Sequence, residues 1–164
     1  MQPAGEVPFS DPGNTVPQGI VNPFNAYLNY RNSFHWDKHA YVTAGCTPFG
    51  GCDYGQARLT HFTHDANDIN TTWQSIESRK YPLENRVWYN LPGQNSNPNC
   101  NIGTACAGSY DQPSAVGRVL DDGSTQLSRY DYNAAGNITS FVDPAGRTTK
   151  FIYAPNLIDL TEVA

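Results

Sequence analysis

Short runs of aromatic and β-branched residues alternate with polar, glycine-containing segments over the last third of the chain. Runs of this kind occupy residues 116–120, 127–132, 137–142 and 147–153, and residues 157–164 have a similar composition. Aromatic and β-branched side chains favour strands, whereas Asn, Asp, Pro and Gly favour turns. The pattern therefore predicts a series of antiparallel strands that are joined by tight turns.

The turn sequences between these runs recur at a regular spacing. Gly136 and Gly146 lie ten residues apart, and each closes a segment that opens with Asn or Asp. Glycine takes a positive φ without steric cost, so we expect these glycines at the ends of hairpin turns. Tyr132 and Tyr153 lie 21 residues apart, the length of two strands with their turns. This spacing predicts a repeated unit of about twenty residues.

The preceding residues are less regular. Residues 1–26 are rich in Pro, Gly and Asn and predict an irregular arm. The aromatic residues of 27–54 are too unevenly spaced for a helix, and we expect one or two strands there. Further strands are expected at 58–65, just after residue 70 and at 86–89, with an exposed loop over 95–114. The chain then divides into the arm of 1–26, divergent hairpin units with two cysteine-bracketed loops over 27–115, and regular hairpins over 116–164.

Composition favours an all-β fold over one with long helices. Charged residues make up 15% of the chain, which is few for helical surfaces, and aromatic residues make up 12%. The 14 glycines and 12 prolines suit short strands with many turns. We expect repeated antiparallel β-hairpins that form an extended, twisted or spiralling sheet with long loops.

The net charge of −5 at pH 7 argues against nucleic acid as a partner, because phosphate binding requires a basic surface. No stretch approaches the roughly 18 apolar residues of a membrane span, so we predict none. The first residues lack the basic and apolar regions of a secretory signal. The chain is therefore expected either in the cytosol or as a mature or interior piece of a larger exported protein.

Four cysteines form two pairs, each with five residues between its members. Cys46 brackets a glycine-rich loop with Cys52, and Cys100 does the same with Cys106. We expect two disulfide-closed loops, because structural zinc sites usually space their ligands two to four residues apart. A zinc site and free thiols are the alternatives. Disulfides would place the chain in an oxidising setting, outside the cell or on its surface.

The sequence YDYNAAGNITSFVDPAGRTTKFIY, residues 130–153, resembles the RHS/YD repeat. The residues that carry the likeness are its aromatic entry and turn positions: Tyr130, Tyr132, Gly136, Asn137, Asp143, Pro144, Gly146, Arg147 and Tyr153. The likeness is specific over residues 117–163 and looser over 58–94. In the unit that follows, Asn156 stands where the turn glycine is usual.

The resemblance to RHS/YD-repeat proteins implies a long spiralling β-sheet, which forms a hollow shell around an effector or a stalk at the cell surface. Shells of the family end in an Asp-Pro-x-Gly-Leu junction, at which self-cleavage releases the effector. Here Arg147 follows Gly146. We therefore interpret Asp143 and Pro144 as part of a turn and not as a protease site.

The chain contains no recognisable catalytic motif, and we expect no enzymatic activity. His35 and His39 are expected on a strand, where residues four apart lie too far from each other to share one metal ion. His61 and His64 would point to opposite faces of a strand. We therefore predict no metal site and no cofactor.

Two short sequences, at Asn70 and Asn137, fit the acceptor pattern for N-glycosylation. Tyr and Trp rings stack on sugars, so a face that contacts glycans is one interpretation of the many aromatic residues. Pairing of the rings across strands is the other interpretation, and we favour it.

One hairpin cannot bury its own face, so neighbouring hairpins must pack beside it. We therefore predict a structural or assembly module of an extracellular or cell-surface RHS/YD-repeat protein, such as a shell, stalk or filament wall. The C-terminal strand of one copy is expected to meet the N-terminal arm of the next in a homo-oligomer or filament, or a longer chain continues the sheet. A carbohydrate-binding or adhesin module is the alternative.

Overall fold

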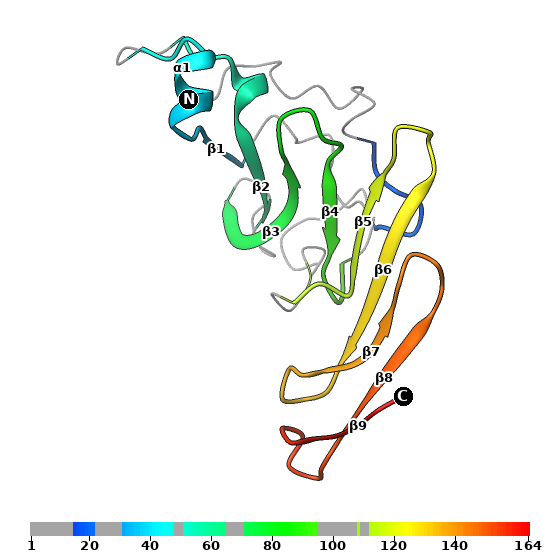
Figure 1. Cartoon of the computed structure of the whole chain (residues 1–164). Helices are drawn as coiled ribbons and strands as arrows, with labels where there is room; N and C mark the ends of the chain where they lie inside the picture. The colour runs from blue at the N-terminus through cyan, green and yellow to red at the C-terminus, as the bar shows by residue number, and fades with distance from the viewer. Residues whose placement is uncertain (1–14, 22–30, 48–50, 65–70, 95–107, 109–111) are drawn as a thin grey trace.

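The structure is a computed structural model that describes residues 15–21, 31–47, 51–64, 71–94, 108 and 112–164. Nine strands form one sheet in which each strand pairs with its neighbours in the sequence (Figure 1). All eight pairings are antiparallel. The sheet is open, with β1 at one end and β9 at the other. This arrangement confirms the predicted all-β fold.

The strands are β1 (Asn32–His35), β2 (Arg58–His64), β3 (Thr72–Lys80), β4 (Val87–Asn90), β5 (Ala115–Val119), β6 (Thr125–Tyr132), β7 (Ile138–Val142), β8 (Thr148–Tyr153) and β9 (Leu160–Val163). Between β1 and β2 lie a short helix, α1 (Lys38–Thr43), and a 3-10 turn, η3 (Tyr54–Gln56). The strands expected at 58–65, 86–89 and between 116 and 153 are all present, with small shifts at their ends.

The segment after β1 differs from the sequence-based prediction, which placed only strands over 27–54. The six-residue helix α1 forms there instead. The Asp37 carboxylate begins this helix by accepting a 2.8 Å hydrogen bond from the backbone N–H of Ala40, which lowers the pKa of Asp37. No residue of α1 is buried, so the helix has no apolar stripe from which periodicity could have predicted it.

The apolar core is small and lies on one face of the sheet at β2 and β4. Leu59 and Trp88 form its centre, with 5% and 1% of their surfaces exposed. Val16, Ile20 and Phe34 pack against them and remain partly exposed. The core therefore joins β1, β2 and β4 to a piece of the N-terminal arm.

Residues 15–21 of the arm lie on the sheet of their own chain, and Figure 1 shows this segment beside β5. The indole N–H of Trp88 donates a 3.0 Å hydrogen bond to the carbonyl oxygen of Thr15. The side-chain oxygen of Asn90 accepts a 2.7 Å bond from the backbone N–H of Val21. This part of the arm is therefore held on the sheet of its own chain, and the predicted contact of the arm with another copy stays a prediction.

The turns that join β6 to β7 and β7 to β8 share one hydrogen-bonding pattern. The side-chain oxygens of Asn133 and Asp143 each accept bonds of 2.9 and 3.0 Å from the backbone N–H groups two and four residues later. The glycine three residues on has a positive φ in both turns, 83° at Gly136 and 81° at Gly146. The prediction of left-handed glycines at these two positions is confirmed.

The loop between β8 and β9 departs from this pattern. Its residue with a positive φ is Leu157, at 63°, and not Asn156, which the repeat comparison placed at the glycine position. The side-chain oxygen of Asn156 accepts 3.1 Å bonds from the backbone N–H groups of Ile158 and Asp159. These two bonds fix the loop on both sides of Leu157 and hold that residue in its left-handed conformation.

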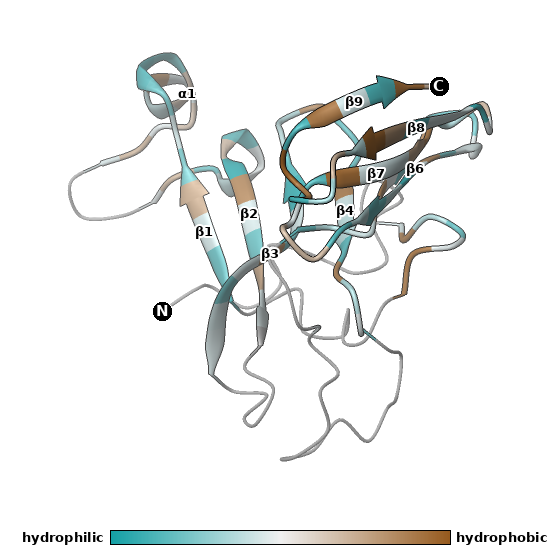
Figure 2. Ribbon diagram, turned by 90° about the horizontal axis from the view of Figure 1, so that it is seen from below, coloured by the Kyte–Doolittle hydropathy of each residue, from teal (hydrophilic) through white to brown (hydrophobic). Residues whose placement is uncertain are grey.

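Strands β6, β7, β8 and β9 lie side by side as one layer (Figure 2). No residue of these four strands is buried, and all four residues of β9 are exposed. Buried residues occur in β2, β3, β4 and β5 instead. Backbone hydrogen bonds and cross-strand side-chain pairs therefore stabilise the C-terminal half of the sheet.

Replacing Gly146 by alanine tests the left-handed turn. A Cβ at Gly146 would meet no atom within 4 Å, so the change adds only the cost of a positive φ. We expect the free energy of unfolding, measured by chemical denaturation, to fall by about 1–2 kcal/mol. Ala145→Ser in the same turn is the control and should change it by less than about 0.5 kcal/mol. Equal effects of the two substitutions would contradict this account.

Candidate functional site

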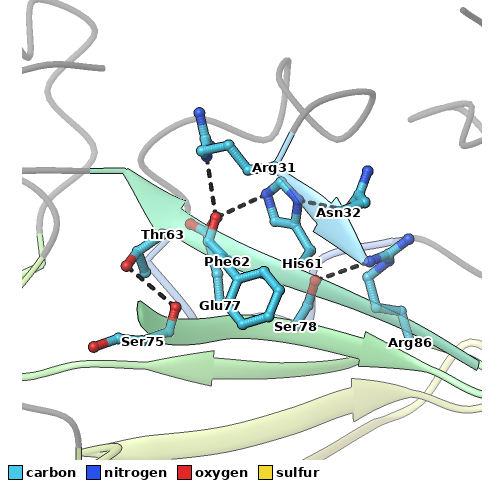
Figure 3. Close-up of polar contacts among 9 residues, drawn as sticks. All are labelled: Arg31, Asn32, His61, Phe62, Thr63, Ser75, Glu77, Ser78 and Arg86. Atoms are coloured by element: carbon cyan, nitrogen blue, oxygen red, sulfur yellow. Dashed lines mark hydrogen bonds and ion pairs between the residues drawn. The ribbon is translucent and has the colours of Figure 1, made fainter. Parts of the chain in front are cut away.

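A cluster of buried polar side chains lies where β1, β2, β3 and β4 meet (Figure 3). We use the name His61 cluster for Arg31, Asn32, His61, Glu77, Ser78 and Arg86. His61, Ser78 and Arg86 are fully enclosed, and Glu77 is 4% exposed. Buried polar groups are costly unless other protein groups satisfy them, so the contacts within this cluster decide whether this end of the sheet is stable.

An irregularity in the β2–β3 ladder brings Glu77 to His61. The register pairs His61 with Ser78 and Phe62 with Ile76, which leaves Glu77 as the extra residue of a bulge. A bulge places two residues opposite one and redirects the extra side chain. As a result, Oε2 of Glu77 lies 3.1 Å from Nε2 of His61.

The other ring nitrogen of His61 faces β1. Its Nδ1 lies 2.8 Å from the side-chain amide oxygen of Asn32, the residue opposite His61 in the β1–β2 ladder. Burial lowers the pKa of His61 below its ordinary value of 6.5, and the contact with Glu77 opposes part of this shift. Nε2 of a neutral ring faces the carboxylate at 3.1 Å without hydrogen-bond geometry, and Nδ1 accepts when the Asn32 amide turns its NH₂ group to the ring.

Two arginines complete the cluster. Nη1 of Arg86 donates a 2.9 Å hydrogen bond to Ser78 Oγ, and its guanidinium lies 5.5 Å from the centre of the Trp88 ring. Nε of Arg31 donates a 3.0 Å bond to the carbonyl oxygen of Phe62. Arg31 has a φ of 57°. A left-handed conformation costs a non-glycine residue about 1–2 kcal/mol, so the chain enters β1 through a strained residue.

The arrangement of the His61 cluster suits the joining of strands and not the conversion of a substrate. Asn32 and Glu77 occupy both ring nitrogens of His61, and the ring is fully enclosed. The imidazole is therefore not placed to take a proton from a nucleophile or a water molecule. The sequence pattern indicates His61 only as a candidate metal ligand and gives no sign of Glu77, because a bulge, and not strand alternation, brings the two together.

Two tyrosines of the repeat pattern fasten neighbouring segments through their hydroxyl groups. The hydroxyl of Tyr132 donates a 2.8 Å hydrogen bond to the carbonyl oxygen of Pro113, and that of Tyr153 donates a 2.9 Å bond to Ile138. Burial raises the pKa of Tyr132. Both hydroxyls therefore act as structural donors in the sheet.

Tyr130 packs its ring against neighbouring rings. Its centroid lies 6.5 Å from that of Tyr132 and 5.2 Å from that of Phe141, its partner across the β6–β7 ladder. Cross-strand pairs of this kind stabilise antiparallel sheets. These aromatic residues therefore pair with one another, as the favoured interpretation of the sequence predicted.

Asp143, Pro144 and Arg147 lie together in the turn between β7 and β8, as predicted. The Asp143 carboxylate accepts a 2.6 Å hydrogen bond from Nε of Arg147 in addition to the bonds from the turn backbone. The backbone N–H of Arg147 is the main cause of a lowered pKa of Asp143. These residues therefore stabilise a turn.

Of the two candidate glycosylation sites, the structure describes only the one at Asn137. The side-chain nitrogen of Asn137 donates a 2.8 Å hydrogen bond to the carbonyl oxygen of Leu157. A glycan would be attached to this same nitrogen, so modification would disturb a contact between two turns. Asn70 lies outside the described residues.

Cys46 and Cys52 are joined by a disulfide, as predicted. The bridge closes the loop between α1 and η3, beside a hydrogen bond of 3.1 Å from the indole N–H of Trp36 to the carbonyl oxygen of Asp53. Disulfides persist mainly in oxidising compartments. Cys100 and Cys106 lie outside the described residues.

The two histidines before β2 lie on different elements, and not on one strand as predicted. His35 ends β1 and His39 lies in α1, and both are exposed. Within the described ranges, no group of three or more His, Cys, Asp or Glu side chains lies close enough together to hold a metal ion. The helix that the structure describes is too short to span a membrane.

Comparison with known proteins does not assign the chain to a family. A scan against models of protein families and a search of curated proteins both find no match. The function must therefore be inferred from the geometry of the chain itself.

Acid should destabilise the fold through His61. In the unfolded chain His61 binds a proton as the pH falls past its ordinary pKa of 6.5. In the folded chain the pKa of His61 is lowered, so the ring binds a proton only at lower pH. At about pH 5.5 this difference removes up to about 1.4 kcal/mol from the free energy of unfolding relative to pH 7.5. Urea denaturation at the two pH values measures it.

His61→Gln should lose this part of the pH dependence, because glutamine does not bind a proton in this range. His39→Gln is the matched control, since His39 is exposed and the other titrating groups are unchanged. The same pH dependence in the wild type and in His61→Gln would show that His61 does not titrate in this way.

Removing the disulfide should weaken the fold modestly. The bridge closes a short loop, so replacing Cys46 and Cys52 together by serine should cost about 2 kcal/mol, the low end of the usual range. Chemical denaturation measures the loss. Mass spectrometry of the unreduced wild type should recover Cys46 and Cys52 in one cross-linked product, and alkylation of these two cysteines in the native protein would contradict the bridge.

Proposed function

We propose that the chain is a structural or assembly module of an extracellular or cell-surface protein built from RHS/YD-type repeats. Its role is mechanical, as part of a shell, stalk or filament wall in which the sheet continues from one hairpin unit to the next. Support comes from contacts that recur between the hairpins, from the edge of β9, and from a disulfide that suits an oxidising compartment.

One contact between turns recurs along the chain, and it is the observation that carries the proposal. The side-chain nitrogen of Gln112 donates a 3.0 Å bond to the carbonyl oxygen of Gly136, and that of Asn133 donates a 2.8 Å bond to Leu157. Both contacts span 24 residues, and the second lies 21 residues after the first. Both accepting residues have a positive φ. Successive units are therefore joined by the same geometry, as in repeat proteins.

Strand β9 offers an edge at which a further strand can pair. Ala164 and Lys150 exchange two backbone hydrogen bonds, of 2.8 and 3.0 Å. Hydrogen-bonded and non-hydrogen-bonded pairs alternate along an antiparallel ladder, so Val163 and Phe151 form a non-hydrogen-bonded pair. The N–H and C=O groups of Val163 therefore point away from β8. Leu160 and Val163 are 50% and 56% exposed. Apolar edges of this kind accept strands from other chains.

A further unit would pair with β9 and come either from a second copy or from a longer chain. When it comes from a second copy, the contact joins the opposite ends of two sheets and does not close on itself. It would then propagate head to tail as a filament. Residues 15–21 would take no part in this contact, because they lie on the sheet of their own chain.

Glycan binding by an adhesin module is the second candidate, and exposed rings on β3 and just after it favour it. Trp73 is 51% exposed and Tyr81 is 42% exposed. Aromatic rings that reach solvent can stack on sugars. Quenching of tryptophan fluorescence by added sugars in the wild type, and its loss in Trp73→Ala, would favour this function over assembly.

Assembly should depend on the backbone N–H of Val163. Val163→Pro removes this N–H, which points away from β8, so the fold of the chain should be kept while the edge loses a donor. We expect the wild-type mass, measured by light scattering, to rise with protein concentration, and that of Val163→Pro to remain at the monomer value. Negative-stain microscopy should show filaments of the wild type alone.

Val163→Thr is the matched control, because it keeps both the β-branched shape and the backbone N–H. This variant should assemble like the wild type. A wild-type chain that stays monomeric at high concentration, or a Val163→Pro chain that assembles equally well, would contradict assembly through β9.

A further inference from the structure

The edge strand β1 is held to the sheet by few contacts. It has four residues and, among the described strands, pairs only with β2. The helix α1 that follows it has no buried residue, and Phe34 supplies the apolar contact of β1 with the Leu59–Trp88 centre. Segments with few buried apolar contacts open at a lower free-energy cost than the whole fold. This end of the sheet can therefore open locally.

The His61 ring lies at the joint between this segment and the rest of the sheet. It contacts Asn32 of β1 at 2.8 Å and Glu77 of β3 at 3.1 Å (Figure 3). Beside it, the backbone N–H of Phe62 donates a 3.0 Å bond to the carbonyl oxygen of Arg31. The left-handed φ of Arg31, 57°, can relax when β1 leaves the sheet. Loss of the His61 contacts would therefore release strain as well as β1.

The closed fold disfavours a proton on His61. The groups that face the ring from the described elements around it are Asn32 on β1, Glu77 and Ser78 on β3, and the arginines Arg31 and Arg86. Two of these groups are positive and one is negative. A protonated ring would add a further positive charge in an enclosed site, whereas water stabilises that charge once the site is open.

We propose that the His61 cluster is an acid-sensitive latch, which holds β1 and α1 on the sheet near neutral pH and releases them in acid. The neutral ring joins β1 to β2 and β3 in the closed state. Acid favours the open state, in which the protonated ring meets water while β2 to β9 stay in the sheet. Opening exposes Phe34 and Leu59 and leaves the edge of β2 unpaired, and such an edge can accept a strand of another chain.

Hydrogen–deuterium exchange of the full chain at about pH 7.5 and about pH 5.5 tests the latch, with rates divided by the intrinsic rate at each pH. In the wild type, the opening constant for amides of β1 and β2 should rise about tenfold in acid, because the open state binds a proton that the closed state does not. Amides of β6 and β7 exchange only when the whole chain unfolds, so their opening constants should stay well below those of β1 and β2 at both pH values.

The same experiment on two variants assigns the effect to His61. His61→Gln should lose the tenfold rise at β1 and β2, and His39→Gln should retain it. A rise of the same size in His61→Gln would overturn the proposal. So would equal opening constants for the amides of β1–β2 and of β6–β7 in acid, because the acid response would then be global unfolding and not release of one segment.

An NMR titration of the wild-type imidazole keeps the proposal testable if His61→Gln does not fold. In the closed state the His61 ring resonances should not shift between about pH 7.5 and 5.5. A His61 ring that gains its proton in the closed state at or above pH 6.5 would overturn the latch.

Discussion

Backbone hydrogen bonds between consecutive strands support most of this structure, because the chain has only a small apolar core. Leu59 and Trp88 are its centre, and no residue of β6, β7, β8 or β9 is buried. A strand in such a sheet is stable only when a neighbour pairs with its edge. Each hairpin therefore depends on the one before it, which accounts for a strand order that follows the chain from β1 to β9.

Side-chain amides also hold successive hairpins together at the turns, but the loop between β8 and β9 lacks the two asparagines that make this contact in the preceding unit. Asn133 and Asn137 both donate to the carbonyl oxygen of Leu157 and so hold the last described hairpin to the preceding one. One unit of 21 residues later, Ala154 and Ile158 stand in their places, and neither carries an amide.

The opposite end of the sheet uses buried polar contacts where a larger protein would use apolar packing. The bulge at Glu77 brings a carboxylate to His61, and Arg86 lies against Ser78 and Trp88. Such a cluster fixes one register of β1, β2 and β3, because a slip of one residue would leave several polar groups buried without partners. The same burial makes this end sensitive to pH, whereas the C-terminal hairpins depend on contacts that do not titrate near neutrality.

The sequence by itself determined the parts of the fold that depend on neighbouring residues. The turns at Gly136 and Gly146 could be predicted because a tight turn needs its Asn or Asp and its glycine within a few positions. Only the tertiary structure decided that Glu77 meets His61 and that residues 15–21 cover the sheet of their own chain. These contacts depend on a bulge and on the register of strands distant in the sequence, and local composition does not encode strand register.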